Sequence, residues 1–286
     1  MEKNLLKTTI LKPENLVLKQ YIEYFLFLRK KDAAPIQYTT FPNNNLCLAV
    51  YRHNHINYQN DGKVNRCIIK AGSHTFSSRI YGFHNRPFQV DVQQELDQIC
   101  IIFYPAALKA FTRMNFDEMH GNDQVFEQLF LPKDEYFLEQ LFEEPDPARQ
   151  ARQLEGLLLS QLEECRVLKI REALYHLSVA QPNNQNVGME MLCQKLGVSD
   201  TTLFRLFKNS LGQNPQKYLK TIRFRQALKD LTTTQDLLTT VALRHCYYDQ
   251  AHFIKDFKTF TGYSPKKLLH KVSIQQQSLA WIYQEN

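Results

Sequence analysis

The stretch YYDQAHFIKDFKTFTGYSP, from Tyr247 to Pro265, nearly repeats an earlier stretch, GVSDTTLFRLFKNSLGQNP, from Gly197 to Pro215. Both contain a bulky apolar residue, a Phe-Lys pair, a glycine and a proline at the same spacing. The matched residues are Leu203, Phe207, Lys208, Gly212 and Pro215 in one copy, and Phe253, Phe257, Lys258, Gly262 and Pro265 in the other. Every matched position is displaced by the same 50 residues. A constant displacement indicates a repeated structural unit.

Each copy predicts a helix, a tight corner and a second helix. Gly197 suits the first corner because glycine adopts left-handed backbone at little cost. Ser199 and Asp249 follow the two corners and are the expected N-caps of the second helices. One face of each second helix is apolar and should be buried, which places in the core Leu203, Leu206, Phe207, Phe253, Phe257 and Phe260.

The opposite faces of the second helices are polar and basic. A helix fits the DNA major groove, where a few of its side chains can contact base edges. Arginine and lysine suit guanine, glutamine suits adenine, and apolar groups suit the thymine methyl. The candidate DNA-binding residues are Thr201, Phe204, Arg205, Lys208, Gln250, Ala251, His252 and Lys255. Two alternatives stay open: Phe204 packs on a neighbouring helix, and His252 is a neutral bystander.

Charge is distributed unevenly along the chain. The 286 residues carry a net charge of +6. Residues 166–271 contain 17 lysines and arginines against 7 aspartates and glutamates, so the remainder is mildly acidic. This division favours a polyanion-binding module joined to a second domain, although a solvated basic surface would have the same composition. A tandem helix-turn-helix inside the basic segment is a stronger indication than charge alone.

Residues 187–269 resemble the DNA-binding domain of AraC/XylS-type bacterial transcription regulators. The resemblance rests on LCQKLGVSDTTLFRLFKNSLGQNPQKYLKTIRFRQALKDL, on VALRHCYYDQAHFIKDFKTFTGYSP, and on a linker helix with Arg223 and Ala227. It implies seven helices, two recognition helices in adjacent major grooves, and control of a promoter. It assigns base reading to Thr201, Phe204 and Arg205 in one helix and to Gln250, Ala251, His252 and Lys255 in the other.

The resemblance also implies partners and a location. These are double-stranded promoter DNA, RNA polymerase, a small-molecule effector and a second copy of the chain, in the cytoplasm. Activation is the expected mode of regulation, with repression left open. Three positions depart from the family pattern, and they put the local turn geometry in question: Cys246 replaces a corner glycine, Cys193 replaces an alanine, and Leu268-Leu269 replaces an aromatic-basic pair.

The whole chain predicts an α+β protein with two domains. Residues 1–160 are the expected effector-sensing and dimerisation domain, a β-rich barrel with helices that resembles, more loosely, the cupin-like sensor regions of the same family. Residues 161–286 are the expected all-α DNA-binding domain. Turn-prone stretches such as RHNHINYQNDGK separate the predicted strands, which are Leu46–Tyr51, Arg66–Lys70, Phe88–Val92 and Gln98–Tyr104.

Helices are expected on both sides of the domain boundary. One long helix should run from about Ala148 to Ala180. Its residues Leu154, Leu157, Leu158 and Leu162 form one apolar stripe, which is either core or a dimer seam. From Val187 onward the pattern is entirely helical, with segments at Met189–Leu196, Ser199–Lys208, Pro215–Leu231, Leu238–Arg244, Asp249–Phe260 and Pro265–His270.

Several classes of function are disfavoured. The longest apolar run is too short to span a membrane, and the first residues lack a signal peptide. The six cysteines show no C-x-x-C spacing and are expected as buried thiols in a reducing cytosol. No catalytic constellation or phosphate loop stands out, so no cofactor and no enzyme activity is expected.

Two alternatives keep the same DNA-binding module. In one, a protein partner replaces the small effector. In the other, the N-terminal domain is a metal-binding or enzymatic cupin. Metal binding is disfavoured because His53, His55, His74 and His84 lack the extended His/Glu pattern of metal-binding cupins. The pair His53 and His55 lies in the turn-rich stretch and should be solvated.

Overall fold

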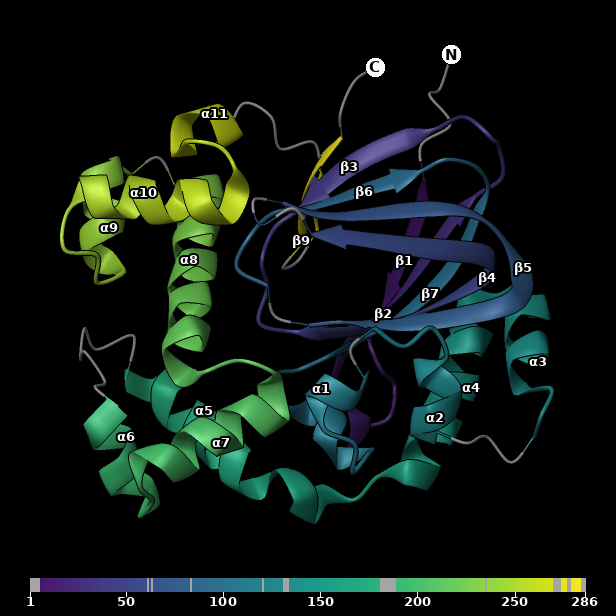
Figure 1. Cartoon of the computed structure of the whole chain (residues 1–286), viewed down its shortest axis with the longest axis horizontal. Coiled ribbons are helices and arrows are strands. Elements are labelled where there is room, and N and C mark those ends of the chain that lie inside the picture. The colour runs from purple at the N-terminus through teal and green to yellow at the C-terminus, as the bar shows by residue number, and fades with distance from the viewer. Residues whose placement is uncertain are drawn as a thin grey trace.

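The structure is a computed structural model, and it describes residues 6–283 except 61, 63, 83, 120, 131–133, 181–188, 235, 270–273 and 277–278. A curved sheet forms an open barrel. Helices α1 to α4 lie along one side of this barrel, and helices α5 to α11 lie beside it (Figure 1). Within the second group, the long helix α8 runs from the end of α7 to α9 and α10 (Figure 1). The expected α+β class is confirmed.

The sheet has the strand order β1-β2-β7-β4-β5-β6-β3-β9-β8. Its neighbours pair antiparallel except β5 and β6, which are parallel. The strands of the barrel are β1 (Lys7–Leu11), β2 (Ile22–Lys30), β3 (Ile36–Thr40), β4 (Leu46–Asn60), β5 (Asn65–Tyr81), β6 (Phe88–Val92) and β7 (Leu96–Phe103).

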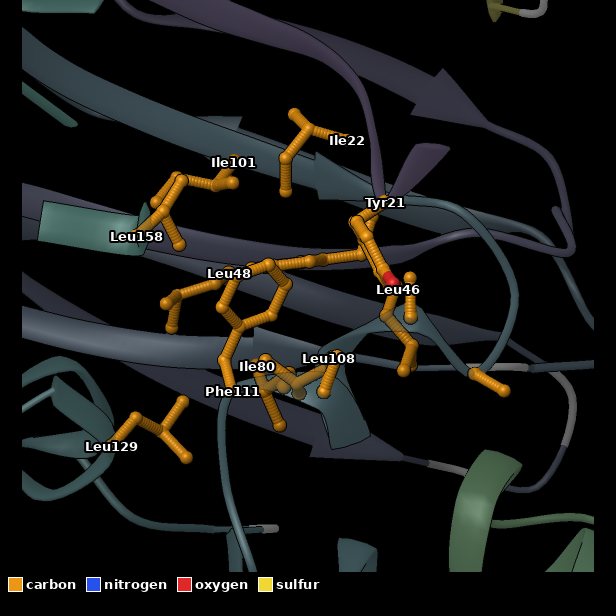
Figure 2. Close-up of a cluster of buried hydrophobic side chains, with 14 of the residues drawn as sticks. Tyr21, Ile22, Leu46, Leu48, Ile80, Ile101, Leu108, Phe111, Leu129 and Leu158 are labelled. Carbon is orange, nitrogen blue, oxygen red and sulfur yellow. The ribbon is translucent and has the colours of Figure 1, made fainter. Parts of the chain in front are cut away.

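Both faces of the central strands are buried. Alternate residues point to opposite sides of a strand, so Leu26 and Leu28 pack inside the barrel while Phe25 and Phe27 pack on its outer face. The helical layer covers that outer face. Figure 2 shows one part of this contact, where Leu158 of α4 lies against Ile101 of β7. Burial on both faces explains why these strands are continuous apolar runs rather than alternating ones.

The barrel contains more strand than the sequence patterns predict. Strands β1, β2 and β3 are not predicted by the sequence patterns. Strand β4 continues through most of the predicted turn stretch to Asn60, and β5 extends to Tyr81, beyond the predicted end at Lys70. The histidine pair lies in β4: His53 sits at a β-bulge with φ 56°, and His55 pairs with Lys70. Both side chains are exposed, as is His74. The prediction of turns was wrong because the residues of this stretch are mostly polar, so they do not show the alternation of apolar and polar residues that indicates a strand.

Five helices follow the barrel strands: α2 and α4 contact strands of the barrel, whereas α5 contacts α6 and α7. The five are α1 (Phe116–Met119), α2 (Val125–Phe130), α3 (Phe137–Glu143), α4 (Pro147–Gln161) and α5 (Leu168–Ala180). The single helix expected from Ala148 to Ala180 is therefore wrong. Glu163 adopts an extended conformation, with φ −127°, and its amide donates a hydrogen bond to the Ala110 carbonyl at 2.7 Å. This contact with a distant residue ends α4.

The leucine stripe of α4 belongs largely to the core. Leu154 and Leu158 are 1% and 0% exposed, whereas Leu157 and Leu162 are half-buried. The dimer-seam alternative is wrong for the first two residues, since they already pack inside the chain.

The C-terminal helices agree closely with the predicted segments. They are α6 (Met189–Leu196), α7 (Asp200–Leu211), α8 (Pro215–Thr233), α9 (Leu238–Arg244), α10 (Gln250–Thr261) and α11 (Pro265–Leu269), and the predicted helix end at His270 lies outside the described residues. The all-helical expectation after Val187 is wrong at one place. The hairpin β8 (Ile274–Gln276) and β9 (Leu279–Tyr283) follows α11, and β9 pairs with β3 of the barrel.

The helical group is packed firmly against the barrel. Phe41, which follows β3, is 4% exposed and lies in the same apolar cluster as Phe224 and Phe257. Leu203 and Phe207 of α7 belong to the cluster that also covers the outer face of the barrel. The two halves of the chain therefore share apolar cores.

Candidate nucleic-acid interface

Helix α7 is built as the repeat predicts. The hydroxyl of Ser199 accepts a hydrogen bond from the Thr202 amide, and Gly212 ends the helix in the left-handed conformation. Leu203 and Phe207 are buried, and Leu206 is half-buried. The opposite face is exposed and carries Thr201, Phe204, Arg205 and Lys208.

Phe204 is directed outward, with 48% of its surface exposed. An aromatic ring on an exposed polar face is available for a thymine methyl. The alternative, in which Phe204 packs on a neighbouring helix, is therefore not what the structure shows. Arg205 lies next to it on the same exposed face. Lys208 differs from both, because its ammonium group donates to the Gly212 carbonyl at 3.3 Å, at the end of its own helix.

Helix α10 repeats the design of α7. The carboxylate of Asp249 accepts a hydrogen bond from the His252 amide at 2.7 Å, and Gly262 ends the helix at φ 76°. The predicted stripe of Phe253, Phe257 and Phe260 is buried. The DNA-facing candidates divide into two groups: Ala251 and Lys255 are exposed, whereas Gln250 and His252 are half-buried.

The two half-buried candidates contact neighbouring side chains. The Thr239 hydroxyl donates to Oε1 of Gln250 at 2.7 Å, which connects α9 to the start of α10. A carbonyl oxygen has two lone pairs, so this oxygen can still accept a hydrogen bond from a base. His252 lies edge-on to the Tyr247 ring, and its Nε2 is 3.7 Å from the Asp256 carboxylate. Both side chains are thus oriented before any DNA arrives.

Helix α8 separates the two copies. The Asn214 side chain accepts from the Lys217 amide, and Pro215 occupies the first turn. Its 19 residues span about 28 Å at the helical rise per residue. Arg223 of this helix donates to the Cys246 carbonyl at 3.3 Å and stacks over the Tyr247 ring. Arg223 therefore holds the second corner in place.

A small charged network fixes α9 on α8. Arg244 donates to Asp230 at 2.8 Å and pairs with Asp236 at 2.8 Å, and Nε2 of His245 lies 2.9 Å from Asp230. Burial alone would raise the pKa of Asp230, but the hydrogen bonds from Arg244 and His245 outweigh it and lower that pKa. The sequence patterns did not indicate this network, because its members lie on two different helices.

The second corner carries a non-glycine residue in left-handed backbone. Cys246 has φ 55°, and its side chain is exposed. The expectation of buried thiols is thus wrong for Cys246, while Cys67, Cys100 and Cys193 are buried and Cys47 is half-buried. The side chain of Cys165 lies outside the described residues. A corner glycine would adopt this φ at lower cost.

The described part of the chain offers neither a metal-ligand cluster nor a membrane-spanning helix. Among these residues no three His, Cys, Asp or Glu side chains gather closely enough to hold a metal ion. In the same part, no helix combines the length and apolar character needed to cross a membrane.

Comparison with known proteins finds two family models that each match a part of the chain. A family model described as a helix-turn-helix domain matches residues 192–271. A second, described as a domain of unknown function (DUF6597), matches residues 12–125. The first match covers α6 to α11 apart from the first residues of α6, and with them all eight candidate DNA-binding residues.

Individual relatives cover different shares of this chain. An uncharacterised helix-turn-helix transcriptional regulator of Staphylococcus aureus is 33% identical over 84 residues, which are 29% of this chain and 11% of that protein. This chain thus spans only about a ninth of the curated relative's length. The C-terminal domain of AraT from Geobacillus stearothermophilus is 26% identical over 38% of this chain and 89% of its own, with a TM-score of 0.34. ToxT from Vibrio cholerae is 10% identical over 93% of this chain and 98% of its own, with a TM-score of 0.45.

Proposed function

Since residues 192–271 form a helix-turn-helix domain of the AraC type, we propose that the protein is a sequence-specific DNA-binding regulator of transcription. The observation that carries the proposal is the matched exposure of α7 and α10 at the two ends of α8. Each helix buries one apolar face and presents a short row of polar, basic and small side chains on the other. Double-stranded promoter DNA is the proposed partner.

The two helices read two successive major grooves. These grooves recur about every 34 Å along one face of the duplex, and the length of α8, about 28 Å, is close to that repeat. A single recognition helix reads only a few base pairs. Two helices at a fixed separation within one chain therefore read a longer site without a second subunit.

Specific contacts are assigned from the exposed faces. Arg205 and Lys255 donate to guanine, and Gln250 contacts adenine while the Thr239 hydroxyl holds its carbonyl oxygen. Phe204 and Ala251 contact thymine methyls. Thr201 and His252 complete the two rows, and Lys208 serves the phosphate backbone or its own helix end.

The N-terminal half supplies regulation in this proposal. Residues 1–160 sense a small-molecule effector and pair two copies of the chain, while residues 161–286 bind DNA and contact RNA polymerase. The shared apolar clusters support regulation, because a change in the barrel is transmitted through packed side chains rather than a flexible linker. The surface through which two copies pair is not formed by the leucines of α4, because these lie largely in the core.

Binding to a library of site variants tests the base-reading assignment. Arg205→Ala should relax specificity at one cluster of base pairs, and Gln250→Ala should relax it at a second cluster about one helical turn away. Each substitution should cost about 1–3 kcal/mol on the matched site. Lys195→Ala, on the exposed surface of α6, is the control, and it should weaken all sequences alike and lower the salt dependence. Loss of discrimination at the same base pairs in both variants would contradict the bipartite assignment.

A further inference from the structure

The barrel contains an internal cavity of about 150 Å³. Most of its wall is apolar and comes from β2, β4, β5, β6 and β7, with Leu26, Ile69 and Val90 as typical members. The hydroxyl groups of Tyr51 and Tyr81 also face it, but they lie 2.7 Å apart and bond to each other. An engineered apolar cavity of about 150 Å³ is enough to hold a benzene molecule. The barrel therefore has room for a body of about one aromatic ring.

One wall of this cavity comes from the DNA-binding half. Arg225, in the middle of α8, lines the cavity together with Phe41 and residues of the barrel. Its neighbour Arg223 is bonded to the second corner, as described above. Arg225, by contrast, has no hydrogen-bond or ion-pair partner among the described residues. Figure 1 shows α8 running alongside the barrel.

Loss of contact with water is unfavourable for the Arg225 guanidinium unless an anion pairs with it. This loss lowers the pKa of Arg225 to about 10, against the opposing influence of Tyr24 and Glu23. Glu23 is the nearby carboxylate, and it already accepts a hydrogen bond from the Asn45 amide. Arg225 is half-buried, and a guanidinium in such a place without an ion-pair partner is unfavourable; the usual remedy is a bidentate anion.

Two residues of the cavity wall each have a buried polar atom without a hydrogen-bond partner in the described part of the chain. The two atoms are Oε1 of Gln98 and Nε2 of His84. The amide nitrogen of Gln98 already donates to Cys100 at 3.1 Å, so only its oxygen is available. Each atom can bond one polar substituent of a ligand.

We propose that the cavity binds a small organic acid whose apolar body, about one ring in size, lies inside the barrel and whose carboxylate pairs with Arg225 of α8. The proposal rests on the proposed function and gives the chemical class of its effector. The ligand contacts the barrel and the DNA-binding half at once. It therefore favours the arrangement in which α8 lies against the barrel, and DNA affinity changes with its concentration.

Direct binding to the full chain tests the ligand class. The acid probes are benzoate, phenylacetate, 4-hydroxybenzoate and cyclohexanecarboxylate, and the neutral control is benzamide. At least one acid should bind saturably by calorimetry and raise the melting temperature, whereas benzamide should bind at least tenfold more weakly. Decanoate, with a longer body, should bind more weakly than the best ring acid. Absence of binding by every acid up to about 10 mM, equal binding of benzamide, or stronger binding of decanoate would each overturn the proposal.

Substitutions on α8 test the role of the arginine. Arg225→Gln should lose at least tenfold in affinity for the best acid, and Arg225→Lys, which keeps the charge, should recover part of the loss. Lys220→Gln removes the same charge from an exposed position on the same helix and should bind the acid normally. Equal affinity of Arg225→Gln and the unmodified chain would overturn the assignment. Acid binding is measured without DNA, so a failure of DNA binding in the unliganded protein concerns only the proposed function.

Discussion

The ring of Phe116 occupies the space beside Gly212, where an added Cβ atom would lie 2.3 Å from ring carbon Cδ1. The same ring also blocks a side chain at Gly82, at the end of β5, where a Cβ atom would lie 2.1 Å from Cζ. Phe116 thus lies between the barrel and the end of the first recognition helix. Gly212 is required there for two reasons, its positive φ of 69° and this close approach.

Gly212→Ala should destabilise the protein more than the matching change in the second copy. Gly262 has a similar φ of 76°, but an added Cβ atom there would meet only Pro87 at 3.8 Å. Gly262→Ala should therefore cost about 1 kcal/mol from backbone strain alone. Gly212→Ala should cost at least about 1 kcal/mol more, because the clash with Phe116 is added. Urea unfolding of both variants makes the comparison, and equal losses would show that the ring moves aside freely.

A double substitution isolates the Phe116 contact. Phe116→Ala removes the ring, so adding Gly212→Ala in that background should cost only the backbone strain, about 1 kcal/mol. Free energies of unfolding for the two single variants and the double variant give the coupling. Strict additivity would mean that Phe116 and Gly212 do not constrain each other.

Cys246→Gly should stabilise the protein by about 0.5–1 kcal/mol. The residue sits at φ 55° with an exposed side chain, so the substitution relieves strain and removes little packing. Differential scanning calorimetry under reducing conditions measures the change. Cys246→Ala is the control, because it removes the thiol and keeps the strain. A lower melting temperature for Cys246→Gly than for Cys246→Ala would show that the corner tolerates a side chain without cost.

Leu158→Asp should unfold the chain rather than release folded monomers. The side chain is completely buried against the barrel, and an unpaired carboxylate there costs several kcal/mol. Its neighbour Leu159 is 39% exposed, so Leu159→Asp should remain folded. Circular dichroism and sedimentation of both variants provide the measurement. A folded Leu158→Asp protein of half the mass would instead establish α4 as a subunit contact.

Asp230→Asn should destabilise the protein by about 1–2 kcal/mol at pH 7, because it weakens the bonds to Arg244 and His245. The folded pKa of Asp230 is lowered. Its contribution is therefore present above its unfolded pKa of about 3.9 and is lost as the pH falls through the folded value. Denaturant unfolding at pH 7 and about pH 3 should show the gap between variant and unmodified protein shrinking. An equal gap at both values would show that the charge of Asp230 is not responsible.

Local signals predicted the C-terminal helices well and the barrel poorly. N-caps such as Ser199 and Asp249 act within a few residues, so α7 and α10 were predicted within a few positions of their ends. Strand β2 was missed because YFLFL is buried on both faces and shows no alternation. The end of α4 before Glu163 depends on a hydrogen bond to the Ala110 carbonyl, and no residue close to Glu163 in the sequence indicates that bond.

The candidate site was also predicted only in part. The exposed face of α7 follows from helical periodicity, as do Ala251 and Lys255 on α10, whereas Gln250 and His252 were expected on the exposed face and are half-buried. The bonds that orient Gln250 and occupy Lys208 were not predicted, since they depend on where Thr239 and the helix end lie in space. Arg225 and Phe116 have no local signal, because their roles depend on contacts between the two halves of the chain.

The pairing of β9 with β3, through Thr40 and Trp281 among others, changes the mechanics of the DNA-binding half. The chain leaves the barrel side through α5 and returns to it at β9, so the helices between them are anchored at both ends (Figure 1). A domain that is attached by one linker can rotate and move within the reach of that linker. A domain that is attached to the barrel at two points has less freedom, because rotation is then easiest about the line that joins these points. The two attachments therefore restrict how far α7 and α10 can turn relative to the barrel.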